Sequence, residues 1–380
     1  MNLGKILALF VLVIASHKGM ATPTESHRIK TIEIKSTIAA QQLNFKVILP
    51  QGYDTQSEKK YPVLVTETDQ GRLALIQQQL DWLSHVDFGP IPKMIIVSMP
   101  NIKTSKKIKQ KNAEASGEDT PLIIKVLKHE LLPYIDQEFN TQPFRIIESY
   151  STFANLPLGI LALKPELFNA YISISPALVL DKSGLLEQLK TRLKADPLAY
   201  KNLYASLGDM AQNKPRFAEL EQLLSAEKTQ LSWTLADLSG VNYYTTATTV
   251  LPQALEKLFA DRQPKDISQF METGVKGVED YFKQLQQKYG FEVSPISTLH
   301  DLGQMQLDHQ QYRAALSTFQ RITTLKPSSI YYLTLLAKAQ HKNQQTDLAS
   351  ATLERALTLA KNGQYPSDIE YVKAQIALLN

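Results

Sequence analysis

The chain has 380 residues, of which 43% are hydrophobic and 21% charged, and its formal net charge is +4. This composition is that of an ordinary globular protein with room for two domains. The chain contains no cysteine, which excludes disulfides, thiolate metal sites and a lipid attached to a cysteine at a cleavage site.

Residues 1–21 predict a signal peptide. Lys5 precedes an almost wholly apolar run, and Gly19 and Ala21 put small residues at −3 and −1 of a cut after Ala21. A membrane anchor is the weaker alternative, because the run is only about half of the ~20 residues that a span needs. Cleavage removes two lysines and no acid, so the net charge of +4 becomes +2. We expect a periplasmic or secreted protein that has no transmembrane span after cleavage and does not bind nucleic acid.

Residues 22–262 predict one α/β domain. Short apolar or alternating runs indicate strands at 29–36, 43–49, 62–66, 93–99, 144–147, 171–175, 203–207 and 231–235. Helical patterns lie between several of them, at 73–83, 121–139, 153–163 and 251–259. The first two strands read as an antiparallel pair, and the later alternation predicts a doubly wound, mostly parallel sheet. No metal site or nucleotide-binding loop is recognisable, so no cofactor is predicted.

Residues 144–176 form the central unit of this domain. A buried strand leads into the small polar turn 149–152, then into an apolar helix that stops at Lys164-Pro165, and then into a second strand. Strand, tight turn, helix and strand make one right-handed parallel unit. The turn is the place where an α/β-hydrolase keeps its nucleophilic serine.

Residues 263–380 predict an all-helical domain after a polar linker at 262–265. Small and large residues recur at the spacing of a tetratricopeptide repeat, in two units about 34 residues apart. The first unit contains Leu302, Gly303, Ala315, Phe319 and Pro327, and the second contains Leu336, Ala337, Ala349, Leu353 and Ala356. The second unit lacks the closing proline, and residues 369–379 are expected to form a capping helix.

Residues 28–260 resemble a bacterial esterase family of α/β-hydrolases that includes siderophore esterases and esterase D. Members carry an arginine, a strand, Gly-x-Ser-x-Gly-Gly, a helix, a Pro-x-x-Phe turn and a strand that ends in Ser-Pro. The matching residues here are Arg145, Ser151, Pro165 to Phe168, and Ser175-Pro176. The resemblance implies the α/β-hydrolase fold and carboxylic-ester hydrolysis, and members often carry a helical tail of this kind.

Ser151 occupies the nucleophile position, but the turn around it departs from the family. Ser149 and Phe153 stand where the family has glycines two residues before and two residues after the serine. Glycine after the serine lets the helix pack close to the strand. The ring of Phe153 is therefore expected to widen the turn or to fill the pocket. In the alternative reading, Ser151 is only a polar turn residue.

The resemblance places the catalytic histidine in a loop before the last helix, where this chain has Tyr243. Tyrosine has a pKa of about 10, so it keeps its proton at neutral pH and cannot serve as an ordinary base. The acid position of the family falls on Asp209, after the strand 203–207. Asp237 is a weaker candidate, and without a histidine Asp209 can also be read as a plain turn residue.

The oxyanion site of the family requires two backbone N–H groups, which fall here on Thr152 and Asp69. The family sequence Asp-Gly-Asp is replaced by Thr68-Asp69-Gln70 followed by Gly71, and the Asp69 carboxylate would oppose an oxyanion. Lys103, Lys106, Lys107, Lys109 and Lys111 lie in a loop that covers the active site in the family. They indicate either a lid that recruits an anionic ligand or a solvated loop.

Two hypotheses follow. In the first, the protein is an exported esterase relative with an impaired catalytic site. It binds a small ester or anionic ligand in the old pocket and a peptide or protein on the helical repeats. In the second, it is an active serine esterase that uses Ser151 with a non-standard base.

Overall fold

The computed structural model describes residues 28–67, 70–86, 89–100, 102, 120–196 and 198–378. The predicted signal peptide at 1–21, Asp69 and the lysine-rich segment Lys103–Lys111 lie outside the described residues. None of the helices in the described ranges is both long enough and apolar enough to cross a membrane.

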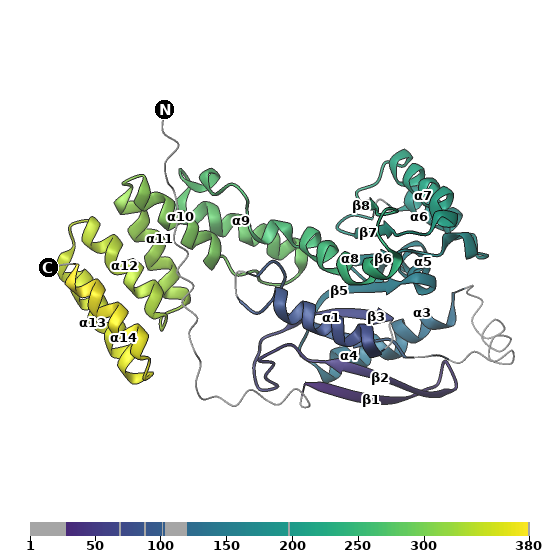
Figure 1. Cartoon of the computed structure of the whole chain (residues 1–380), viewed down its shortest axis with the longest axis horizontal. Coiled ribbons are helices and arrows are strands. Elements are labelled where there is room, and N and C mark those ends of the chain that lie inside the picture. The colour runs from purple at the N-terminus through teal and green to yellow at the C-terminus, as the bar shows by residue number, and fades with distance from the viewer. Residues whose placement is uncertain are drawn as a thin grey trace.

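Eight strands form one sheet in the order β1-β2-β4-β3-β5-β6-β7-β8 (Figure 1). Their bounds are β1 Ile29–Ser36, β2 Gln41–Ile48, β3 Tyr61–Glu67, β4 Ile95–Ser98, β5 Thr141–Tyr150, β6 Ala170–Ile174, β7 Asn202–Leu207 and β8 Ser232–Asp237. β2 pairs antiparallel with both β1 and β4, whereas all pairs from β4 through β3 to β8 are parallel. The predicted mostly parallel sheet is confirmed.

Helices cover both faces of the sheet, because successive strand residues point to opposite sides. Ile146 faces the core under α1 (Gln70–Leu83) and α8 (Tyr243–Leu258), whereas Ile147 faces the core on the other side. That second face packs α3 (Leu122–Val126), α4 (Leu132–Glu138), α5 (Asn155–Leu163), α6 (Leu185–Ala195) and α7 (Lys214–Ala226). The arrangement is the doubly wound α/β fold that the sequence predicts.

Two predicted helices differ from the structure in detail. The helix expected at 121–139 contains a π-helical turn at Leu127–Leu131 between α3 and α4. The helix expected from residue 251 begins at Tyr243, because the Asn242 side chain caps it by accepting the Tyr244 N–H at 3.0 Å. Tyr243 therefore lies in the first turn of a helix and not in a loop.

From residue 274 to residue 377 the chain is a succession of helices that extends away from the sheet (Figure 1). They are α9 (Gly274–Tyr289), α10 (Ile296–Asp308), α11 (Tyr312–Leu325), α12 (Ile330–Lys342), α13 (Thr346–Asn362) and α14 (Pro366–Ala377). Gly303 lies against the ring of Phe319, where an added Cβ would be 2.7 Å from a ring carbon. The all-helical C-terminal region is confirmed, with small residues where its helices approach closely.

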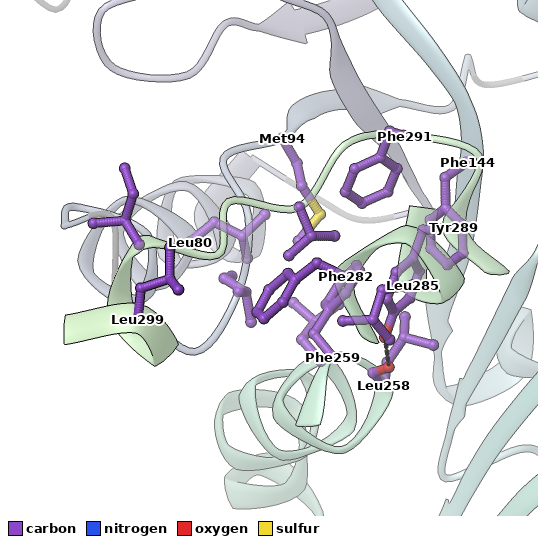
Figure 2. Close-up of a cluster of buried hydrophobic side chains, with 14 of the residues drawn as sticks. Leu80, Met94, Phe144, Leu258, Phe259, Phe282, Leu285, Tyr289, Phe291 and Leu299 are labelled. Carbon is purple, nitrogen blue, oxygen red and sulfur yellow. Dashed lines mark hydrogen bonds between the residues drawn. The ribbon is translucent and has the colours of Figure 1, made fainter. Parts of the chain in front are cut away.

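One hydrophobic core joins the helical region to the sheet, as Figure 2 shows. The Phe144 ring, on β5, lies 5.7 Å from Phe259, 5.4 Å from Tyr289 and 5.9 Å from Phe291 between ring centroids. The Tyr289 hydroxyl also donates to the Leu258 carbonyl at 3.0 Å. The core thus continues across the expected boundary between residues 262 and 263, and α9 is fixed to the end of α8.

Candidate active site

Ser151 occupies a strained turn at the carboxyl end of β5. Its φ is +67°, in the left-handed region, and a 3₁₀ turn at Ser151–Ala154 leads directly into α5. A residue other than glycine in that region costs about 1–3 kcal/mol, and the conformation persists only where the surrounding structure imposes it. This is the backbone geometry of a nucleophile elbow, and it puts the side chain at the top of the sheet.

The altered residues around Ser151 do not relax this turn. Ser149 is fully buried within β5, and the Phe153 ring is 54% exposed. The Phe153 ring points toward solvent, so the expectation that it fills the pocket is wrong, and Ser151 itself has a φ of +67°. The Ser173 hydroxyl supports the turn by donating to the Ala154 carbonyl at 2.7 Å.

Tyr243 lies next to the residue that precedes Ser151. The rings of Tyr150 and Tyr243 are 4.8 Å apart, and the Tyr150 hydroxyl donates to the Tyr243 carbonyl at 3.1 Å. Burial raises the pKa of Tyr150 above its usual value, and Tyr243 raises it further, while Arg72 acts in the opposite direction. Tyr150 is therefore a neutral hydrogen-bond donor at neutral pH.

A hydroxyl network holds the first turn of α8 in this position. Thr246 Oγ1 donates to the Tyr243 carbonyl at 2.6 Å and lies 3.2 Å from Ser175 Oγ. Ser175 Oγ also accepts the Gly208 N–H at 3.1 Å. The serine of the Ser-Pro pair, which has a φ of +50°, thereby connects the ends of β6 and β7 to α8.

The two candidate acids lie on nearby turns, but neither is bonded to Tyr243. Asp209 follows β7 and is exposed, and its backbone N–H donates to the Val241 carbonyl at 3.1 Å. Asp237, at the end of β8, accepts the Ser239 N–H at 2.9 Å and faces Lys214 at 3.7 Å. The Ser239 hydrogen bonds and Lys214 lower the pKa of Asp237. Among the described residues, no hydrogen bond joins either carboxylate to the Tyr243 side chain.

No histidine in the described ranges is hydrogen-bonded to Ser151. His85 follows α1 and donates to the Trp82 carbonyl at the opposite edge of the sheet. His129 is exposed on the π-helical turn. His300, His309 and His341 belong to the helical region, and His17 and His27 lie outside the described residues.

Half of the predicted oxyanion site can be located. Thr152 lies in the first turn of the 3₁₀ segment, where helix geometry leaves backbone N–H groups without a partner in the helix itself. Its N–H can therefore be offered to a ligand at the serine. Asp69, the other predicted contributor, lies outside the described residues.

A buried ion pair beneath the serine was not predicted. Glu148, three residues before Ser151, is fully buried and forms a salt bridge with Arg72 of α1. Thr66 Oγ1 donates to Glu148 Oε2 at 2.7 Å, and the Arg72 guanidinium lies 5.4 Å from the centre of the Tyr150 ring. The signal in the sequence is a glutamate directly after the buried apolar pair Ile146-Ile147, because a carboxylate that is buried requires a partner.

This architecture, with a strained serine between a parallel strand and a helix, defines the protein as an α/β-hydrolase-fold protein. The model of the family Putative esterase matches residues 36–233, which is 198 of the 380 residues. The chain belongs to this family, as the sequence predicts.

Two solved structures share the fold over most of the chain. An IroE-like serine hydrolase from Shewanella oneidensis is 19% identical with a TM-score of 0.57, and the match covers 89% of this chain and 99% of that one. An uncharacterised protein from Capnocytophaga ochracea is 15% identical with a TM-score of 0.63, and the match covers 92% and 99%. Both matches extend beyond the esterase segment into the helical region. Comparison with curated protein sequences gives no match.

Proposed function

We propose that this protein is an exported member of the family that has lost most of its esterase activity and acts by binding. The observation that carries the proposal is Tyr243, which stands in the first turn of α8 where the family has its histidine. Five described histidines lie elsewhere, and a tyrosine does not accept the serine proton at neutral pH. Loss of one triad member typically reduces kcat by several orders of magnitude.

The first proposed ligand is a small ester or anionic molecule at the old site. The Thr152 N–H, in the first turn of the 3₁₀ segment, would bind an oxygen atom of the ligand, and the exposed Phe153 and Tyr244 rings would offer apolar contacts. Such a ligand would be bound without being turned over.

The second proposed partner is a peptide or protein on the helical region. We propose that α10–α11 and α12–α13 are tetratricopeptide-like helix pairs. The first helix of each pair has a buried small residue at the corresponding repeat position, Gly303 in α10 and Ala337 in α12. His300 Nε2 lies 3.0 Å from the Tyr331 hydroxyl, and Tyr371 lies 3.4 Å from Thr334 between hydroxyl oxygens. Tyr331 and Tyr371 remain 47% and 39% exposed, so α12 and α14 present half-exposed aromatic side chains.

A fluorophosphonate probe followed by intact mass measurement tests the loss of activity. We expect no adduct on the folded protein, with Ser151→Ala as the matched control. An adduct that forms on the parent protein and not on Ser151→Ala would mean that a base activates the serine, and the proposal would be wrong.

That outcome would favour the second candidate function, an active serine esterase with a non-standard base. The observation in its favour is the φ of +67° at Ser151, since the elbow strain persists without the glycines of the family. Hydrolysis of p-nitrophenyl acetate that depends on Ser151 would then accompany labelling.

Export is tested separately by expressing the full chain in a bacterium and measuring the mass of the protein in the periplasmic and cytoplasmic fractions. Cleavage after Ala21 gives a chain that begins at Thr22. Recovery of the uncleaved chain in the cytoplasm would contradict this part of the proposal.

A further inference from the structure

A cavity of about 300 Å³ lies at the amino edge of the sheet, where the helical region packs against it. The starts of β3 and β5 contribute Tyr61 and Gln142, and the helical side contributes Phe291 and Lys326. Ser151 is at the other end of β5, roughly 30 Å away for nine residues of extended strand. The cavity is therefore separate from the candidate active site.

The residues that line this cavity are strongly biased toward positive charge. Its cationic side chains are Lys59, Lys60, Lys93, Arg262 and Lys326, with His85 beside them. Glu292 is the one acidic residue among those lining residues that the structure describes. Cations from the sheet edge and from the helical side thus converge on one concave surface, which favours the binding of an anion.

Two buried polar atoms in the lining have no hydrogen-bond partner in the described part of the chain. They are Arg262 Nε and Gln142 Oε1, and the side-chain amide of glutamine can be turned so that its NH₂ group is the one presented. Burial lowers the pKa of Arg262, an effect that Tyr289 and Asp261 oppose, and the guanidinium stays charged at neutral pH. A planar guanidinium matches the oxygens of a phosphate or carboxylate.

Apolar side chains form much of the rest of the cavity wall. Buried Tyr61, Ile91, Phe291 and Val293 line it, and Phe291 also belongs to the core in Figure 2. Its volume lies at the lower end of the ~300–1,000 Å³ typical of small-molecule sites. These dimensions suit an organic molecule that carries phosphate or carboxylate groups better than they suit a bare inorganic ion.

We propose that this cavity is a second binding site for a small organic polyanion, which would bridge Arg262 and the lysines of the sheet edge to the helical region. The proposal is independent of the state of Ser151. A ligand bound there would contact both parts of the chain and raise the midpoint temperature of unfolding by mass action.

The test is calorimetric titration of the full chain carrying Ser151→Ala, so that hydrolysis cannot contribute heat. The probes are citrate and phenyl phosphate, with sulfate at matched ionic strength as a simple anion. We expect a Kd below about 1 mM for at least one probe and weaker binding of sulfate. The stronger of the two probes identifies carboxylate or phosphate as the preferred group.

Variants locate the site. Lys60→Gln/Lys326→Gln and Arg262→Gln should each weaken binding by about tenfold or more, the effect of losing one charged contact. Lys182→Gln/Lys228→Gln removes the same two charges from exposed positions outside the cavity and should leave the affinity unchanged. If Arg262→Gln does not fold, the lysine pair decides the question. Equal losses in both double variants, or no binding of either probe at 10 mM, would overturn the proposal.

Discussion

The ring of Tyr243 lies against the ring of Tyr150, tilted by 34° at a centroid distance of 4.8 Å. The Tyr150 hydroxyl also donates to the backbone carbonyl of Tyr243. The contact ties the start of α8 to the residue that directly precedes Ser151. Tyr243 thus has a structural role in this chain.

Tyr243→His should restore little activity. A well-placed general base contributes about 10²–10⁴-fold, but Asp209 is exposed and no described carboxylate is bonded to residue 243. We expect Ser151-dependent hydrolysis of p-nitrophenyl acetate to rise by about tenfold or less. Tyr243→His/Ser151→Ala supplies the background rate. A rise of a thousandfold would show that the rest of the catalytic apparatus is intact.

Removing one member of the buried ion pair should destabilise the protein strongly. Arg72→Ala leaves the fully buried Glu148 carboxylate without its guanidinium, which typically costs about 3–5 kcal/mol. The free energy of unfolding can be measured by urea titration. Arg216→Ala is the matched control, because the Arg216–Glu219 pair is exposed and should change stability by about 0.5 kcal/mol or less. If the free energy of unfolding fell by similar amounts in the two variants, burial would not be what makes the Arg72–Glu148 pair important for stability.

Gly208→Ala should disturb the hydroxyl network under α8. A Cβ at this position would lie 2.9 Å from Ser175 Oγ and 3.0 Å from Thr246 Cγ2, so side chains must move. We expect the free energy of unfolding to fall by about 1–3 kcal/mol, as for other overpacked sites. Gly240→Ala has open space around its Cβ and should be nearly neutral. Thermal unfolding of both variants checks this, and an unchanged Tm in Gly208→Ala would refute it.

Buried tyrosines should make the folded protein less stable at high pH. Burial is the main cause that raises the pKa of Tyr150, Tyr171 and Tyr289 above the ordinary value of about 10. Above that pH the unfolded chain loses these protons while the folded chain keeps them. The free energy of unfolding therefore falls, by up to about 1.4 kcal/mol per pH unit for each tyrosine. Below pH ~9 these groups should have no such effect.

Urea titrations between pH 8 and 11 measure this dependence. Tyr289→Phe should reduce the slope above pH ~10. Tyr200→Phe is the control, since Tyr200 is 75% exposed and should not alter the slope. An identical slope in all three proteins would show that Tyr289 does not contribute.

The sequence alone predicted most of the architecture. Strand runs, helix periodicity and the motifs around Ser151 depend on residues close together in the chain, and these local patterns predicted the parallel sheet, the central unit at 144–176 and the helical C-terminal region. The start of α8 was missed because its first turn is polar and lacks the apolar pattern of the rest of the helix, so that Tyr243 was assigned to a loop. α6 and α7 were not predicted at all.

The tertiary structure decided how the candidate site is built. Arg72 and Glu148 are 76 residues apart, and Tyr150 and Tyr243 are 93 apart, so no local pattern reports either contact. Contacts between distant segments also determine the outward direction of Phe153, the exposure of Asp209 and the basic cavity at the amino edge. Each depends on which segments the fold brings together and which atoms it removes from water.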